Sequence, residues 1–498
     1  MKYYVERNLF MQRTKDTVFS KEYLPLLILV LFTFLSLALP SKIALVLTAA
    51  VFAVYAFLKP FDSILYLAVY VAIRPFLTEI NPGLKLIGDI ITVVLLVKLI
   101  IASKFDLKGL LKFKFFEWAF FVFLLLGSIV GYINGVSLGA IIFQIRTFII
   151  MYLIYYFLSR TKLPENWPVK LAWTGVGLGW LLSLHGLVEK LSIRQLLLPT
   201  TWKYMPLSEE NFARIYSLPG NPNSLALILM FCIIGIFYLK HVYDTANTKQ
   251  YKIFLNISYV LFFGIFFLTY SRGTLISATI LAIVYIIMTK NYRLIKQLVL
   301  GAIAGLILVF YPVNSGVMLV KNLGVEAPDA SVVDLSERFG QLFQEKNVNR
   351  MQSTGRIFYI KKGFEIFSDY PITGSGFGTF GGAATISYGS PIYEKYGIDL
   401  SIYYKNKIYS DNQYIQIIAE TGILGVIAFS LYLLGMLALF WKRRDTKFGA
   451  FMAALWLSTC ASGAYYNIWE LKIYTLIFFI ILALFALENK FYKQYELR

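Results

Sequence analysis

Four charged side chains beside polar turns are best placed for chemistry on a phosphate-linked substrate. Arg272 follows a serine, Arg356 follows Ser-Thr-Gly, Arg214 precedes a Leu-Pro-Gly-Asn-Pro-Asn turn, and Asp411 stands in a Ser-Asp-Asn-Gln sequence. A guanidinium is always charged and presents a planar fork of donors, which fits phosphate oxygens and stabilises a departing phosphate. A carboxylate beside a bound phosphate can act as general base for an attacking hydroxyl. The sequence therefore predicts an anionic ligand.

Each of these residues also has a purely structural interpretation. An arginine near a membrane interface can extend its head group to water without binding anything. Ser410 and Gln413 have the spacing of a capping box at a helix start, so Asp411 can be a favourable anion at a helix N-terminus. The base and the helix-start interpretations of Asp411 both remain open from the residues alone.

Arg146 differs from the other arginines because it lies in the middle of an apolar run, beside Gln144. An ionised side chain inside a membrane is unfavourable unless it faces a polar cavity or a partner. We expect Arg146 either to contact substrate or to form a buried pair, with Asp89 as the candidate partner.

Several other chemistries lack their motifs. The chain has no Walker motif, no H-E-x-x-H and no D-x-D pair, and it contains 2 histidines. ATP-driven transport and metal-dependent chemistry are therefore not expected, and we predict no cofactor and no metal site. His185, at the outer end of an apolar run, is expected to be a structural interface residue. Cys232 and Cys460 fall inside apolar runs and are expected to be core residues.

The apolar character of the chain determines the fold class. Of 498 residues, 58% are hydrophobic and 15% are charged, whereas soluble proteins have about 45–50% and about 25%. We predict an all-α polytopic membrane helix bundle with about 14 transmembrane helices, because the apolar runs are long enough to cross roughly 30 Å of hydrocarbon. The predicted spans are 24–39, 43–58, 61–79, 84–102, 116–134, 138–158, 169–187, 223–239, 253–270, 273–289, 297–313, 414–440, 448–466 and 470–488.

The net charge of +19 follows from membrane topology. With the N-terminus in the cytoplasm, most of the 47 basic residues fall in cytoplasmic segments, as the positive-inside rule requires. The charge is scattered over short loops, so no nucleic-acid partner is expected. The predicted organisation is a cytoplasmic N-terminus at 1–23, a bundle at 24–313, an extracytoplasmic loop domain at 314–413, a second bundle at 414–488 and a cytoplasmic C-terminus at 489–498.

The large extracytoplasmic loop is expected to carry function, since connections beyond about 12–15 residues usually do. Apolar residues at helical spacing predict a helix over 356–368, capped by Ser353 or Thr354. A glycine-rich stretch at 374–382 follows. The next stretch is rich in tyrosines, which suit either sugar rings or the membrane interface. They are Tyr388, Tyr393, Tyr396, Tyr403, Tyr404 and Tyr409.

The order of these motifs resembles the O-antigen polymerase and ligase superfamily, integral membrane glycosyltransferases that use undecaprenyl-diphosphate-linked glycans. The resemblance rests on Arg214 with Gly220-Asn-Pro-Asn223, Ser271-Arg272-Gly273, Thr354-Gly355-Arg356, Pro371 with Gly374-x-Gly-x-Gly378, and Asp411-Asn412 followed by Glu420-Thr-Gly422 and Gly425. It implies a fold like the second class of membrane glycosyltransferases, with Arg272 and Arg356 holding the lipid diphosphate. Ligases of the superfamily typically have His-Asn where this chain has Asp411-Asn412, which favours a polymerase.

We therefore predict polymerisation of undecaprenyl-diphosphate-linked repeat units into surface polysaccharide at the outer leaflet of the cytoplasmic membrane. The expected catalytic residues are Asp411, Arg272 and Arg356, and the expected substrate-binding residues are Arg214, Asn221, Asn223, Asn412 and Arg146. The expected partners are the lipid-linked glycan donor and acceptor, membrane lipid, a chain-length regulator and a repeat-unit flippase. A ligase with another acceptor and a flippase or exporter of lipid-linked oligosaccharide are the alternatives.

Overall fold

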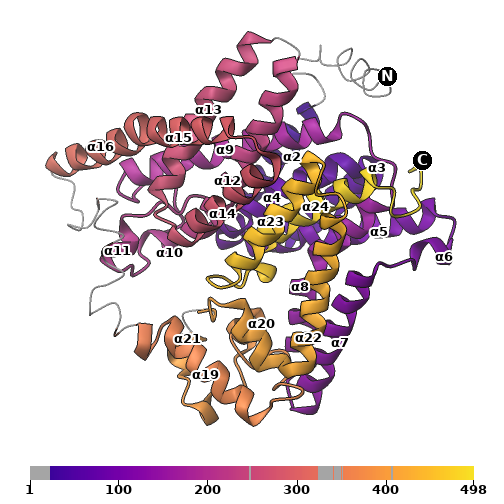
Figure 1. Ribbon diagram of the computed structural model, residues 1–498. Helices are drawn as coiled ribbons and strands as arrows, with labels where there is room; N and C mark the ends of the chain where they lie inside the picture. Colours follow the sequence, from indigo (N-terminus) through magenta and orange to yellow (C-terminus); the bar gives the residue numbers. More distant parts are fainter. Residues whose placement is uncertain are drawn as a thin grey trace. The chain divides into compact units, whose positions relative to one another are not determined.

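The computed structural model describes residues 23–245, 248–323, 351–404 and 408–497, together with 332, 340 and 349 (Figure 1). Every named element in these ranges is helical, and their extended pairing is limited to an isolated bridge between Thr161 and Tyr495. Ten helices among the described residues are long and apolar enough to cross a membrane. The chain is a multi-pass helical membrane protein, as its apolar runs predict.

Ten of the predicted spans correspond to these long helices. They are α3 (Ser41–Leu58), α4 (Pro60–Ile80), α7 (Phe115–Ile133), α8 (Leu138–Ser159), α9 (Trp167–Leu191), α12 (Pro222–Thr245), α13 (Lys249–Leu268), α14 (Arg272–Thr289), the continuous run Arg293–Asn322, and α22 (Gln413–Trp441). The other four predicted spans fall on shorter helices: α2 (Leu24–Leu35), α5 (Ile87–Ala102), α23 (Lys447–Ser462) and α24 (Lys472–Glu488). The predicted total of about 14 is therefore not confirmed by helix length.

The run Arg293–Asn322 extends beyond the predicted span at 297–313. It consists of α15 (Arg293–Gly305), the π-helical turn η4 (Leu306–Phe310) and α16 (Tyr311–Asn322). Asn314 and Val317, which follow the predicted span, are buried within α16, and this helix packs against α9. The helix therefore continues past residue 313, where the predicted span ends.

The described chain forms two compact units, and each combines separated stretches of sequence. Unit 1 draws on Met1–Lys98, Lys162–Ser271 and Arg293–Leu335, and unit 2 draws on Leu99–Thr161, Arg272–Tyr292 and Ser336–Arg498. The predicted division into cytoplasmic ends, bundles and an outer loop concerns the two sides of the membrane and stays a prediction.

In unit 1, α9 packs against α12 and α13, and α13 packs against α15 and η4. Small residues permit this close packing. A Cβ added to Gly179 of α9 would lie 2.4 Å from the ring of Phe262, and one added to Gly264 of α13 would lie 2.9 Å from the carbonyl oxygen of Gly305. The short helices α10 (Thr200–Lys203) and α11 (Glu209–Phe212) lie in the connection from α9 to α12.

In unit 2, α22 packs along α7, α24 along α8, and α23 along α14. The segment 351–404 adds the short elements α19 (Arg356–Asp369), α20 (Ala383–Tyr388), η7 (Glu394–Tyr396) and α21 (Leu400–Tyr403). Helix α19 contacts α22, and α20 contacts α8 (Figure 1). A single 3-10 turn, η8 (Ile468–Glu470), joins α23 to α24.

The elements of segment 351–404 have a small core made largely of tyrosines. Tyr359, Tyr393, Tyr396 and Tyr403 are buried there with Phe380. Tyr393, Tyr396 and Tyr403, which were predicted as sugar-binding or interface residues, are therefore core residues of this cluster. Tyr388 and Tyr404 remain exposed.

Helix α19 confirms the helix predicted over 356–368, but its cap differs from the prediction. The residue at the N-cap is Gly355, and no side chain caps the helix. The proposed caps Ser353 and Thr354 are wrong because the chain enters α19 through an extended glycine, one residue later than the sequence suggested.

A glycine breaks α22 near its first turns. Gly422 has φ +56°, which favours glycine. The backbone N–H groups of Ile423 and Leu424 donate to the carbonyl oxygens of Pro371 and Ile372, at 2.9 and 3.1 Å. The segment before the glycine-rich stretch therefore supplies acceptors at the kink, where the helix ladder is interrupted.

Candidate active site

Asp411 and Arg356 lie side by side in unit 2. Asp411 stands on the loop that leads into α22, and Arg356 is the first residue of α19. The Arg356 Nη2 atom lies 3.3 Å from Asp411 Oδ2, and the two side chains are 46% and 44% exposed. A long, half-exposed ion pair contributes little to stability, so both groups remain available to a ligand.

The backbone of Asp411 is in the left-handed region, with φ +49°. Aspartate and asparagine are the side chains that tolerate this conformation best, although it remains unfavourable relative to glycine. The conformation turns the chain sharply just before α22.

The cap of α22 is Asn412, and the predicted capping box from Ser410 to Gln413 is wrong. Asn412 Oδ1 accepts the backbone N–H groups of Tyr414 and Ile415 at 3.0 and 3.1 Å. The left-handed turn at Asp411 shifts the helix start by two residues relative to Ser410. Asp411 is therefore not required as the cap, and the cap role of Asn412 competes with its proposed role in substrate binding.

Two opposing influences act on the Asp411 carboxyl. Surrounding protein atoms displace water and raise its pKa, whereas the charge and hydrogen bond of Arg356 lower it; the net direction of the pKa is upward. The carboxylate is still nearly half exposed, so solvent moderates the shift. A carboxylate with a raised pKa is a better proton acceptor than an ordinary aspartate.

Arg272 lies close in structure to the turn that Arg356 contacts. It opens α14, and the next two residues of that helix meet Tyr466: a Cβ on Gly273 would lie 2.7 Å from the Tyr466 hydroxyl, and Thr274 Oγ1 lies 3.2 Å from it. Arg356 Nη2 donates to the carbonyl oxygen of the preceding residue, Tyr465, at 3.2 Å. The turn at Tyr465 and Tyr466 thus contacts both the start of α14 and Arg356, and Arg356 is paired with Asp411.

Residues 257–430 match the sequence model of a family described as O-antigen ligase. The matched residues contain the start of α14, Arg356 and Asp411. This part of the chain is therefore similar to the O-antigen ligase family. No curated protein matches the chain. The family match supports an enzyme of the glycosyltransferase type that transfers glycans in polysaccharide assembly.

The matched residues also contain part of a buried polar cluster that the sequence analysis did not identify. Glu420 Oε1 accepts the backbone N–H groups of Gly378, Thr379 and Phe380 at 2.9 to 3.1 Å. The glycine-rich stretch therefore binds the Glu420 carboxylate through three consecutive backbone N–H groups. The signal was present in the sequence, because Glu420 is a charged residue inside an apolar run.

Glu470 is the second carboxylate of this buried cluster. It lies in η8, outside the residues that match the family model. Its Oε1 accepts the side-chain amides of Gln144 and Gln416, both at 2.6 Å, and its Oε2 accepts the backbone N–H of Ala383 at 2.7 Å. Gln144 is thus engaged with Glu470 from within α8. Arg146 lies two residues further along α8 and is partly buried; its substrate role and its pairing with Asp89 stay predictions.

Arg214 and Asn223 form a separate polar cluster in unit 1. Arg214 donates to Asn223 Oδ1 at 2.7 Å, to Asn211 Oδ1 at 3.2 Å and to the carbonyl oxygen of Thr269 at 2.8 Å. Ser271 Oγ donates to the same Asn223 oxygen at 2.9 Å. The structure thus connects two of the motifs that carry the resemblance.

Asn221 has a structural role at the start of α12. Its Oδ1 accepts the backbone N–H groups of Asn223 and Ser224 at 2.9 and 3.1 Å. This arrangement caps the helix, as asparagine at this position commonly does. The proposed substrate contact of Asn221 therefore has to come from its amide nitrogen.

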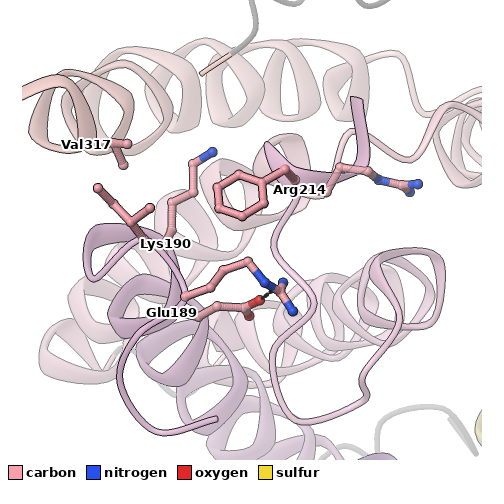
Figure 2. Close-up of a pocket in the computed structure, with 7 residues that line it drawn as sticks. Glu189, Lys190, Arg214 and Val317 are labelled. Carbon is pink, nitrogen blue, oxygen red and sulfur yellow. Dashed lines mark hydrogen bonds and ion pairs between the residues drawn. The ribbon is translucent and has the colours of Figure 1, made fainter. Parts of the chain in front are cut away.

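A small cavity in unit 1 lies beside Arg214 and is lined by Glu189, Lys190 and Val317 among others. Figure 2 shows the Arg214 guanidinium turned away from Glu189. Glu189 is instead paired with Arg194 at 2.5 Å, and Lys190 Nζ donates to a backbone carbonyl. The cavity is therefore bordered by groups that are already bonded within the protein.

The remaining residues singled out in the sequence have structural surroundings. His185 Nε2 lies 2.9 Å from the carbonyl oxygen of Leu197, and its ring packs edge-on against Phe76. Cys232 is buried and Cys460 partly buried, and neither forms a disulfide. No group of three or more His, Cys, Asp or Glu side chains within the described part of the chain could hold a metal ion.

Proposed function

We propose that this protein polymerises undecaprenyl-diphosphate-linked repeat units at the outer leaflet of the cytoplasmic membrane. Asp411 takes the proton of an acceptor sugar hydroxyl, and the hydroxyl oxygen forms a bond to the anomeric carbon of the donor glycan. The bond from that carbon to the diphosphate breaks, and its electron pair leaves with undecaprenyl diphosphate. Arg272 and Arg356 neutralise the charge on the leaving group.

The observation that carries this proposal is the half-exposed pair of Asp411 and Arg356 on a left-handed turn. A proton acceptor and a phosphate ligand must both reach substrate, and each must lie within bonding distance of the reacting atoms. Their adjacency gives a base and a charge-stabilising group in one place. A bound diphosphate would replace the long contact between them with shorter, charge-assisted bonds.

Asp411 also separates the two enzyme alternatives. Ligases of the superfamily typically have His-Asn at the position of Asp411-Asn412, and the acceptor of a polymerase is another lipid-linked repeat unit. The carboxylate therefore favours the polymerase. Arg214, Asn223 and Arg146 are proposed as further substrate contacts, and a chain-length regulator and a repeat-unit flippase as partners.

A flippase or exporter is the alternative from a different class. Such a protein moves a lipid-linked glycan without breaking a covalent bond, so it needs no proton acceptor. The proposed outward side of the site can be tested by labelling a cysteine at the exposed Tyr388 position in intact cells; protection from an impermeant reagent would contradict it.

The experiment is chain extension by the purified protein in detergent micelles. The substrate is the lipid-linked repeat unit extracted from a strain that lacks this protein, and the reaction contains EDTA and no nucleotide. We expect a ladder of longer lipid-linked glycans, with one undecaprenyl diphosphate released for each bond formed. Single transfer to a different acceptor without a ladder would indicate a ligase, and transbilayer movement without bond formation would indicate a flippase.

A further inference from the structure

A buried network of side-chain amides and carboxylates is connected to Ser410, the residue before Asp411. Its members come from three parts of unit 2 and are all buried. They are Gln144 of α8, Gln416 and Glu420 of α22, Asn467 of the turn after α23, and Glu470 of η8. We call this set the amide network.

Gln416 is the centre of the amide network. Its Nε2 donates to Glu470 Oε1 at 2.6 Å and to Glu420 Oε2 at 3.1 Å. Its Oε1 accepts Asn467 Nδ2 at 2.6 Å and Gln413 Nε2 at 2.9 Å. Each polar atom of this side chain therefore has partners, which is the condition under which a buried polar network fixes a single conformation.

The amide network holds the glycine-rich stretch by its backbone. Glu420 accepts three consecutive N–H groups from that stretch, Glu470 accepts the N–H of Ala383, and Gln144 Oε1 accepts the N–H of Ala384 at 2.9 Å. Gly381 lies between these anchored residues. The position of its carbonyl oxygen is therefore determined from both sides.

The Gly381 carbonyl oxygen connects the amide network to Ser410, the residue that precedes Asp411. It accepts the backbone N–H of Ser410 at 3.0 Å and the Asn467 Nδ2 at 3.2 Å. Asn467 Oδ1 in turn accepts the hydroxyl of Ser410 at 3.2 Å. Ser410 is thus held through its backbone and its side chain, and the next residue is Asp411 in its left-handed conformation.

We propose that the amide network, acting through Asn467 and Ser410, positions the Asp411 carboxylate for proton transfer. This inference rests on the proposed function. Asn467 is a positioning residue, because its polar atoms are hydrogen-bonded to Gly381, Gln416 and Ser410, and none of these residues is among the proposed substrate contacts. Misplacing a reacting group by about 1 Å can cost about 100-fold in rate, so a small shift of the turn has a measurable effect.

The test is a double-mutant cycle between Asn467→Ala and Asp411→Asn, measured as steady-state chain extension by the purified protein. We expect Asn467→Ala to lower kcat about 10-fold to 100-fold, with an unchanged KM for the lipid-linked donor. In the Asp411→Asn background the same change should have no further effect, because no base remains to be misplaced. Asn489→Ala is the matched control, since Asn489 caps the end of α24 through Phe485 and lies outside the network.

Loss of kcat by the same factor in both backgrounds would overturn the positioning role and indicate general structural damage. If Asn467→Ala does not fold, Ser410→Ala removes a single hydroxyl from the same path, and we expect about a 3-fold to 10-fold loss that again disappears with Asp411→Asn. Additive losses with that variant would overturn the proposal equally. Wild-type activity of Asp411→Asn alone would instead refute the base assignment in the proposed function.

Discussion

Two arginine–carboxylate pairs, Arg194–Glu189 in unit 1 and Arg356–Asp411 in unit 2, are built differently. Arg194 and Glu189 in unit 1 are 2.5 Å apart and 5% and 1% exposed, whereas Arg356 and Asp411 in unit 2 are 3.3 Å apart and 46% and 44% exposed. The remaining oxygen of Glu189 accepts the N–H groups of Tyr216 and Ser217 at 3.1 and 2.6 Å. Arg194 also stacks over the ring of Tyr216.

The difference shows which pair can act on a ligand. All the bonding capacity of Glu189 is directed to neighbouring protein groups, so a substrate could reach it only by breaking the local structure. The pair in unit 2 leaves both groups accessible, because each side chain is nearly half exposed. We infer that the first pair stabilises the fold and the second serves substrate, and three experiments test this distinction.

The largest expected effect is on the rate of the Asp411→Asn variant. Loss of a general base typically lowers the rate about 10²-fold to 10⁴-fold. Asparagine tolerates the left-handed conformation, and the cap of α22 is Asn412, so the fold should be unchanged. The measurement is chain extension by wild type and variant at equal protein levels.

Asp399→Asn is the matched control for that variant. Asp399 accepts the N–H of Ser401 at the start of α21, and asparagine can replace it there without loss of activity. Near wild-type extension by Asp411→Asn would refute Asp411 as the base, and with it the functional role inferred for the pair in unit 2.

The second effect is on stability and concerns the pair in unit 1. Glu189→Gln leaves a buried guanidinium without its counter-charge, which typically costs about 3–5 kcal/mol. We expect a strongly lowered thermal midpoint in detergent and little folded protein in the membrane. Glu365→Gln removes the exposed pair with Lys362 and should cost at most about 1 kcal/mol. Equal thermal midpoints for Glu189→Gln and Glu365→Gln would show that the buried Arg194–Glu189 pair stabilises the fold no more than an exposed pair does.

The smallest expected effect is a shift in the pH dependence of kcat. The base must be ionised, so the rate rises with pH through the pKa of Asp411 and then levels off. The midpoint should lie above the ordinary value of about 3.9, because burial raises this pKa. Arg356 lowers the pKa, so Arg356→Gln should move the midpoint of the residual activity further upward. An unchanged midpoint would mean that the two side chains do not interact in the working enzyme.

Part of the site was predictable because its signals are local. Arg356 next to a glycine, the helix over 356–368 and the Asp-Asn pair before an apolar run can be read from neighbouring residues. The buried carboxylates were missed although Glu420 interrupts an apolar run. Their partners come from distant positions, since Gln144 and Glu470 are separated by 326 residues in the sequence.

The sequence by itself determined that this chain is a helical membrane protein, because the length and polarity of each apolar run are set by consecutive residues and by the thickness of a bilayer. It also determined the order of the motifs that carry the family resemblance. Tertiary structure alone decided that Asn412 and not Ser410 caps α22, that Asp411 adopts a left-handed turn, and that α16 continues as helix past residue 314. Those outcomes depend on hydrogen bonds and packing between segments far apart in the chain, and no local pattern specifies such partners.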